Sequence, residues 1–129
     1  MKYLFLIIIL LIFGACTSTR SVFSENLADT EWVLEDNHLK LMNEITLRIE
    51  EGRVSGNASC NNYFGNVIID TATRHFSVGK LGVTRKACSK MSPESYFLKM
   101  LEKTNKYRLN RGVLELYQDQ VLLLKFKKK

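Results

Sequence analysis

The sequence predicts an α+β fold that is mainly antiparallel β, in which a barrel-like sheet of seven to eight short strands carries one α-helix. Short runs of alternating apolar and polar residues recur along the chain, and such alternation is typical of strands with one buried face. A single stretch late in the chain instead shows the helical period. The chain has 129 residues, which suffices for one domain with a single core and not for two.

The strand pattern is clearest at residues 44–50, EITLRIE, where Ile45, Leu47 and Ile49 share one face and polar residues occupy the other. Gly52, in the turn that follows, is free to take a positive φ. Further strands are expected before the helix at 31–35, 53–56, 66–70 and 74–78, and after it at 106–110, 113–118 and 121–129. A tight hairpin turn at Asp119 and Gln120 is expected to join the last two strands.

Residues 91–106, MSPESYFLKMLEKTNK, predict one amphipathic helix of about twelve residues. Ser92 is the expected N-cap, Pro93 stands at the first helical position and Glu94 lies in the first turn, which is typical of helix starts. Because the opposite face is polar, the helix is expected to lie across the sheet rather than inside it. Its apolar face is expected to hold Tyr96, Phe97, Met100 and Leu101.

Residues 1–15 predict a bacterial secretory signal peptide, with an apolar run from Tyr3 to Phe13 and small residues after it. At ~1.5 Å rise per residue this run covers about half of a ~30 Å hydrocarbon core, so it is too short to span a membrane as a helix. The segment FGAC, which ends at Cys16, resembles the lipobox of bacterial lipoproteins. This resemblance implies cleavage before Cys16 and a lipid on that cysteine; the alternative is an ordinary signal peptide that happens to contain a cysteine.

Residues 16–26 are expected to form the lipidated N-terminus and a polar tether, and residues 27–129 the folded domain. Thr17 follows the cysteine, and by resemblance to lipoprotein sorting signals the absence of aspartate there favours the outer membrane over the inner. The protein is therefore expected in the bacterial cell envelope, attached to a membrane through its N-terminal lipid.

The formal net charge of +6 allows attraction to anionic headgroups or glycans but is modest for nucleic-acid binding. An exported protein rarely meets nucleic acid, so no such partner is expected. The lysines near the C-terminus could bind anionic lipid. Their alternation with apolar residues favours a last strand whose lysines protect the sheet edge. These lysines are Lys125, Lys127, Lys128 and Lys129.

Cys60 and Cys88 remain as an even pair once Cys16 is set aside, and an exporting compartment permits disulfides. The two residues can form a bridge or remain two buried thiols. A nucleophile at Cys60 would instead need a nearby base that lowers the pKa of its thiol. The chain has two histidines, His38 and His75, and nothing in the sequence brings either of them to Cys60, so no catalytic residue is expected.

The stretch SGNASCNNYFGNV, residues 55–67, predicts an irregular corner between strands. Its asparagines can take left-handed backbone angles and bond their own main chain. A disulfide to Cys88 would pin this corner, with Thr84 and Arg85 nearby. The asparagines concerned are Asn57, Asn61 and Asn62.

A binding surface on the same loop is the alternative interpretation, with Tyr63, Phe64 and Arg85 as the residues to test. The histidines, cysteines and acids show no zinc or calcium spacing, so no metal is expected. The glycine-containing segments lack the glycine-lysine-serine/threonine ending of a phosphate-cradling loop, so no nucleotide or other cofactor is expected.

Several segments together resemble the META domain of HslJ-type bacterial lipoproteins. The stretch GNASCNNYFGNV is similar to the family signature G-x-x-G-C-N-x-x-x-G, and LGVTRKAC contains its second half, T-R/K-x-x-C. The segments WVL, ESYFLKML and LELYQ extend the resemblance over residues 27–127. The chain departs from the pattern at Ser59, where the family usually has glycine, and a serine there is expected to alter the loop if that glycine supplies an unusual backbone angle.

The resemblance implies a small, mainly antiparallel envelope domain that is linked to stress tolerance or secretion and has no established catalytic activity. We therefore expect a monomeric, non-catalytic lipoprotein that acts as a binding or stress-tolerance factor for an unidentified envelope protein or lipid. The alternative is a carrier that holds an acyl chain or a lipidated peptide in its barrel-like core, as pilotins of similar shape do. A tightly filled core would remove that alternative.

Overall fold

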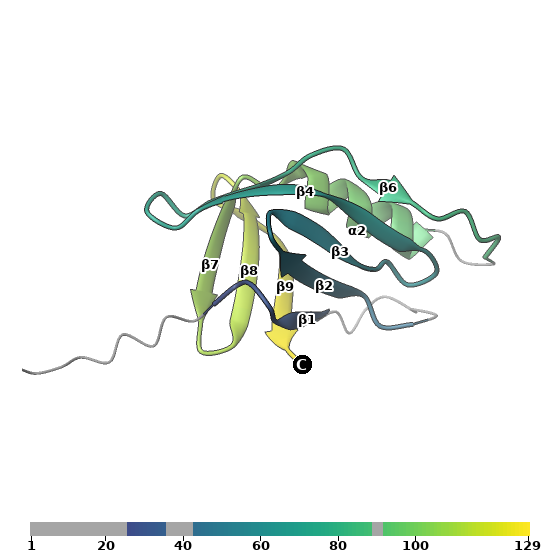
Figure 1. Ribbon diagram of the computed structural model, residues 1–129, viewed down its shortest axis with the longest axis horizontal. Coiled ribbons are helices and arrows are strands. Elements are labelled where there is room, and N and C mark those ends of the chain that lie inside the picture. Colours follow the sequence, from purple (N-terminus) through teal and green to yellow (C-terminus); the bar gives the residue numbers. More distant parts are fainter. Residues whose placement is uncertain (1–25, 36–42, 89–91) are drawn as a thin grey trace, which may run out of the picture.

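The computed structural model describes residues 26–35, 43–88 and 92–129, so the predicted signal peptide, Cys16, Thr17 and His38 lie outside the described residues. Figure 1 shows the arrangement of the elements. In chain order they are β1 (Glu31–Leu34), β2 (Thr46–Glu50), β3 (Arg53–Asn57), β4 (Asn62–Asp70), β5 (His75–Val78), β6 (Gly82–Val83), α2 (Ser92–Lys103), β7 (Lys106–Asn110), β8 (Val113–Gln118) and β9 (Val121–Lys128).

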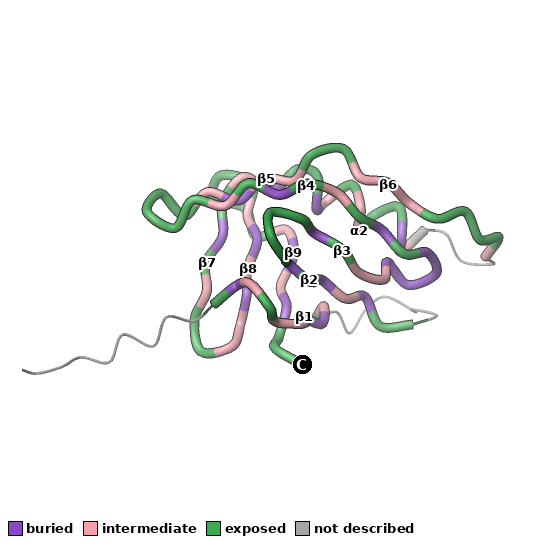
Figure 2. The backbone as a smooth tube through the Cα atoms, viewed as in Figure 1, coloured by how far each residue is buried: buried purple, intermediate pink, exposed green. Residues whose placement is uncertain are grey.

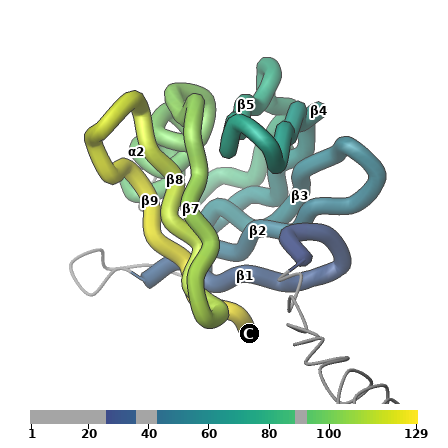
Figure 3. Tube along the Cα trace, turned by 90° about the vertical axis from the view of Figure 1, so that its left-hand side faces the viewer, coloured from purple at the N-terminus to yellow at the C-terminus, as the bar shows by residue number. Residues whose placement is uncertain are grey.

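The described strands form one antiparallel sheet in the order β3-β2-β1-β9-β8-β7-β5-β4-β6. Because β3 also pairs with β4, eight of these strands close into a barrel, and the two-residue strand β6 is attached to β4 as an extension. In Figure 3 the strands surround the centre of the view, with β7 and β8 on one side and β2 and β3 on the other. The predicted α+β fold, a barrel-like antiparallel sheet with a helix packed on it, is confirmed.

Among the neighbouring strands of the barrel, β5 and β7 have the fewest paired residues. Only His75 and Lys106 pair across this seam. Beside that pair, the backbone N–H of Tyr107 donates to the carbonyl oxygen of Arg74 at 3.0 Å. Helix α2 contacts β5 and β9, which β7 and β8 separate in the sheet.

Aromatic rings fill the centre of the barrel. The ring of Phe97, from α2, makes edge contacts with the rings of Tyr63 and Phe126, with centroids 5.4 and 6.4 Å apart. The interior of an eight-stranded barrel can be filled by side chains or can hold one small ligand. The contacts of Phe97 occupy this part of the interior, and the carrier function stays a prediction.

The faces of the strands follow the predicted alternation. Figure 2 shows buried and exposed residues alternating along the barrel. Leu47 and Ile49 of β2 are buried, and Ile45 joins them through an isolated bridge to Ala58. Gly52 takes the predicted positive φ, +75°, in the turn between β2 and β3.

Strand β4 begins at Asn62, four residues before the predicted strand at 66–70. The predicted corner is therefore shorter, and it is reduced to residues 58–61 between β3 and β4. The difference arises because the first part of β4 pairs with β3 on one side and with β6 on the other. The ladder with β3 is a hairpin between neighbouring segments. The pairing with β6 joins Tyr63 to Val83 and Phe64 to Gly82, which are distant in sequence, and a local pattern does not reveal it.

Helix α2 has the predicted length of 12 residues, but its buried face differs from the prediction. Phe97 and Leu101 are fully buried, whereas Tyr96 is 51% exposed, so its assignment to the apolar face is wrong. Glu94, expected only as a first-turn acid, is 2% exposed. The side chain of Ser92 lies outside the described part, and its role as N-cap stays a prediction.

Candidate functional site

Asn61 lies at the centre of the motif segment and is 1% exposed. Its backbone N–H and its Nδ2 donate to the two carboxylate oxygens of Glu94, at 2.6 and 2.9 Å. Its Oδ1 accepts hydrogen bonds from the backbone N–H of Lys86 at 2.7 Å and from the hydroxyl of Thr84 at 3.0 Å. We refer to Asn61, Thr84, Lys86 and Glu94 as the Asn61 cluster.

The Asn61 cluster joins three parts of the chain that are distant in sequence: the corner between β3 and β4, the segment after β6, and the first turn of α2. The hydrogen bonds to Glu94 carry most of this connection, because a bidentate carboxylate acceptor forms stronger bonds than a neutral one. The position of Glu94 in the first helical turn also suits the positive end of the helix dipole. The expectation that Asn61 bonds its own main chain is therefore wrong.

Cys60 and Cys88 form a disulfide beside the Asn61 cluster, with their Cα atoms 6.4 Å apart. This separation lies within the range that a disulfide spans without movement of the backbone. The structure thus favours the predicted bridge over two free thiols. With its sulfur bonded to Cys88, Cys60 presents no thiolate for nucleophilic attack.

Ser59 carries a backbone angle that favours glycine. Its φ is +92°, whereas none of the described asparagines of the corner has a positive φ, contrary to the expectation for them. Asn57 acts instead through its side chain, whose Oδ1 accepts a hydrogen bond from the backbone N–H of Ser59 at 2.9 Å. The chain therefore keeps a glycine-like corner although it has serine at this position.

We expect the substitution Ser59→Gly to raise the free energy of unfolding by about 0.5–1 kcal/mol, because glycine takes a positive φ without strain. The variant keeps the backbone carbonyl of Ser59, which accepts a hydrogen bond from Asn43 Nδ2 at 2.8 Å. Urea unfolding measures the change. Ser55→Gly, within β3, is the control and is expected to lower the same free energy by about 0.5–1 kcal/mol. Equal losses for both variants would contradict the strain at Ser59.

Tyr63 does not belong to a surface. It is 1% exposed, its ring packs in the core, and its hydroxyl donates to the carbonyl oxygen of Thr46 at 2.7 Å. Burial raises the pKa of the Tyr63 phenol, so the group stays neutral and remains a donor. The prediction that Tyr63 contributes to a binding surface is wrong, because neighbouring residues of a strand face opposite sides of the sheet.

Phe64 and Arg85 are brought together by the fold. Phe64 is 49% exposed, and both residues line a surface depression of about 700 Å³. A Cβ on Gly82 would lie 2.5 Å from Cζ of Phe64, so the glycine allows the Phe64 ring to lie over β6. We call this the Phe64 depression; its lining includes Phe64, Leu81, Val83, Thr84, Arg85 and Lys86.

One further candidate residue, His75, lies in the part of the chain that is described. His75 lies on β5, where its Nε2 is 3.0 Å from the hydroxyl oxygen of Ser77. Among the described residues, no three metal-binding side chains of His, Cys, Asp or Glu lie together. No helix within the described ranges is long and apolar enough to cross a membrane.

These features define a class of small antiparallel barrel in which one helix is tied to a disulfide-linked corner. The chain belongs to the META domain family, since the family model described as META domain matches residues 25–129. A comparison with curated proteins finds no match.

Solved structures share this fold. A protein from Burkholderia xenovorans, determined by NMR, is 24% identical, with a TM-score of 0.62 over 80% of this chain and 83% of that one. A second NMR structure is 20% identical, with a TM-score of 0.57 over 76% of this chain and 87% of the other. A crystal structure of a DUF4847 family protein from Bacteroides vulgatus is 18% identical, with a TM-score of 0.53 over 64% of this chain and 57% of that protein.

Proposed function

We propose that the protein is a non-catalytic binding module of the bacterial cell envelope, exported by residues 1–15 and anchored through a lipid on Cys16. The outer membrane is the proposed location, and the polar segment up to residue 26 is the proposed tether. The domain acts as a monomer and uses the Phe64 depression to bind an envelope partner. In this proposal, a role in stress tolerance depends on the binding of that partner.

The observation that supports this proposal is that the motif residues bond to other parts of the fold. Asn61 and Glu94 are hydrogen-bonded to one another, and Cys60 is bonded to Cys88. These groups are therefore engaged in holding the fold rather than available for chemistry. What they hold in place is the segment that carries Arg85, next to the exposed ring of Phe64.

The chemistry of the Phe64 depression suits a protein partner with an apolar and an acidic group. Aromatic and arginine side chains are enriched among the residues that dominate binding energy at interfaces. Arg85 and Lys86 both line the depression, and its one lining acid, Glu94, is buried against Asn61. Because the disulfide and the Asn61 cluster already hold this segment, little conformational entropy is lost on binding.

Photocrosslinking in cells tests the proposed surface. A photoreactive residue at Phe64 of the full-length, exported protein is expected to give a discrete adduct. That adduct should weaken at least about tenfold with Arg85→Glu, the cost of one well-placed charged contact. The control position is Ile68, which is also on β4 and 67% exposed. Equal adducts at Phe64 and Ile68, or none at Phe64, would contradict the proposal.

The proposed anchor has its own test. Cys16→Ser is expected to abolish incorporation of labelled palmitate, because it removes the residue that would carry the lipid. A variant that still takes up the label, or a wild-type protein without label, would contradict lipidation at Cys16.

A further inference from the structure

Three basic residues line one groove beside the seam between β5 and β7. Lys106 and Arg108 are exposed and two residues apart on β7, so they share one face of the strand. Arg74 reaches the same groove from the turn between β4 and β5, where its carbonyl oxygen holds the N–H of Tyr107. The groove has a volume of about 530 Å³. We call it the β7 groove; its lining includes Arg74, Lys106, Tyr107, Arg108, Tyr117 and Asp119.

The positive charges of the β7 groove are not neutralised by ion pairs. The ion pairs within the described ranges are Arg48–Glu50, Lys125–Glu35 and Lys129–Glu31, and none of them includes a base of the groove. The groove thus gathers three positive charges without an ion-pair partner among the described carboxylates.

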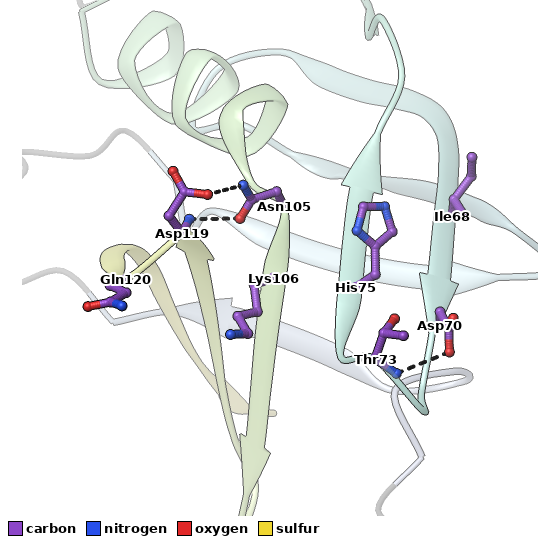
Figure 4. Close-up of a pocket in the computed structure, with 8 residues that line it drawn as sticks. All are labelled: Ile68, Asp70, Thr73, His75, Asn105, Lys106, Asp119 and Gln120. Atoms are coloured by element: carbon purple, nitrogen blue, oxygen red, sulfur yellow. Dashed lines mark hydrogen bonds between the residues drawn. The ribbon is translucent and has the colours of Figure 1, made fainter.

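The two acids near the groove accept hydrogen bonds from neutral donors and keep their negative charges. Asp119 lines the groove, but its Oδ1 accepts a hydrogen bond from Asn105 Nδ2 at 2.8 Å, and Asn105 Oδ1 accepts one from the backbone N–H of Asp119. Figure 4 shows this pair at the turn between β8 and β9, with Lys106 on the neighbouring strand. Glu115 lies opposite Arg108 in the register, and its Oε2 accepts a hydrogen bond from the Tyr117 hydroxyl at 2.7 Å.

Tyrosine rings hold the two guanidinium groups in place. The guanidinium carbon of Arg74 lies 5.8 Å from the centroid of the Tyr107 ring, and that of Arg108 lies 5.4 Å from the centroid of the Tyr117 ring. A cation over an aromatic face keeps its N–H groups available to an anion. The tyrosine rings thus orient both arginines, and neither arginine belongs to an ion pair of the described residues.

We propose that the β7 groove binds the phosphate group of a soluble ligand about the size of a sugar phosphate. Three cations suit a dianion better than a single carboxylate, and arginine pairs bidentately with phosphate oxygens. A neighbouring depression, which shares Lys106, Asp119 and Gln120 with the groove, adds polar groups for sugar hydroxyls. This site is independent of the Phe64 depression and does not rest on the proposed function.

The test is a titration of residues 16–129 with Cys16→Ser, exported behind a cleavable signal peptide that adds no lipid, with glucose 6-phosphate at low ionic strength, where such attraction is least screened. We expect saturable shifts of the backbone amide resonances of Arg74, Lys106 and Arg108, and none with glucose. Arg74→Gln and Arg108→Gln are each expected to weaken binding about tenfold, as the loss of one charge-assisted hydrogen bond does. Lys127→Gln, an exposed lysine on β9 outside the groove, is the matched control and should not change the affinity.

Asp119→Asn is expected to strengthen the binding of glucose 6-phosphate, whereas the arginine substitutions weaken it. Asparagine keeps the oxygen that Asn105 binds and tolerates the positive φ of +55° at this position, but it removes a negative charge from the groove. Binding should become about two- to threefold tighter, the effect expected of one partly screened charge. Absence of saturable binding, an equal loss in Lys127→Gln, or binding to phosphatidylglycerol vesicles without binding to glucose 6-phosphate would each overturn the proposal.

Discussion

Replacement of Glu94 by alanine is expected to lower the free energy of unfolding by about 3–4 kcal/mol. The carboxylate is buried and accepts hydrogen bonds from the backbone N–H and the Nδ2 of Asn61. Without it, the buried N–H of Asn61 loses its partner and Nδ2 keeps only the carbonyl oxygen of Lys86, at 3.4 Å; an unsatisfied donor costs about 1–3 kcal/mol. Urea unfolding of the disulfide-bonded protein measures this change.

Glu94→Gln is expected to rescue little of that loss. Glutamine has one acceptor oxygen, so it satisfies one donor of Asn61 and directs its own NH₂ group at the other. The matched control is Glu102→Gln, where a single backbone N–H, that of Leu81, donates to an exposed carboxylate at 3.2 Å. One acceptor oxygen suffices for the N–H of Leu81, so Glu102→Gln is expected to lower the free energy of unfolding by less than about 0.5 kcal/mol. A Glu94→Gln variant as stable as this control would contradict a structural role of the buried carboxylate.

Gly56→Ala is expected to have the second large effect, a loss of about 3 kcal/mol in the free energy of unfolding. A Cβ at Gly56 would lie 2.0 Å from the carbonyl oxygen of Thr46 and 2.7 Å from its carbonyl carbon, both of them backbone atoms. Thr46 cannot easily withdraw, because its carbonyl accepts the hydroxyl of Tyr63 and its own hydroxyl accepts the N–H of Asn57. The variant must therefore move β2 or β3.

Gly79→Ala is the control for this clash. A Cβ at Gly79 would meet only the carbonyl oxygen of Asn66, at 3.8 Å, which is an ordinary contact. Thermal unfolding of both variants is expected to show a large fall in the midpoint for Gly56→Ala and a small change for Gly79→Ala. Similar midpoints would contradict the close approach of β2 and β3.

Much of the fold could be predicted from local patterns. The alternation in β2, the two-residue turns and the length of α2 depend on residues near one another in sequence, and the structure confirms them. The pairings that close the barrel could not be predicted. The pairing of β4 with β6 and the single pair between His75 and Lys106 join residues that are distant in sequence, so they leave no mark on the local pattern.

The site was only partly predictable for the same reason. The disulfide and the proximity of Thr84 were expected, but the partner of Asn61 lies 33 residues away on another element. One signal could have found it: Glu94 shares a helix face with Phe97 and Leu101, at spacings of three and seven residues, so the acid had to be buried with them. Strict alternation along β4 could likewise have separated Tyr63 from Phe64.

The central claim is that the motif residues hold the helix to the barrel corner rather than perform chemistry. A double-mutant cycle between Asn61→Ala and Glu94→Ala tests it most directly, because it isolates the interaction of the two side chains from their separate contributions. With urea unfolding as the measurement, we predict a coupling free energy of about 2 kcal/mol, as expected for a buried, charge-assisted hydrogen bond. A coupling below about 0.5 kcal/mol, the range found for independent sites, would contradict the claim.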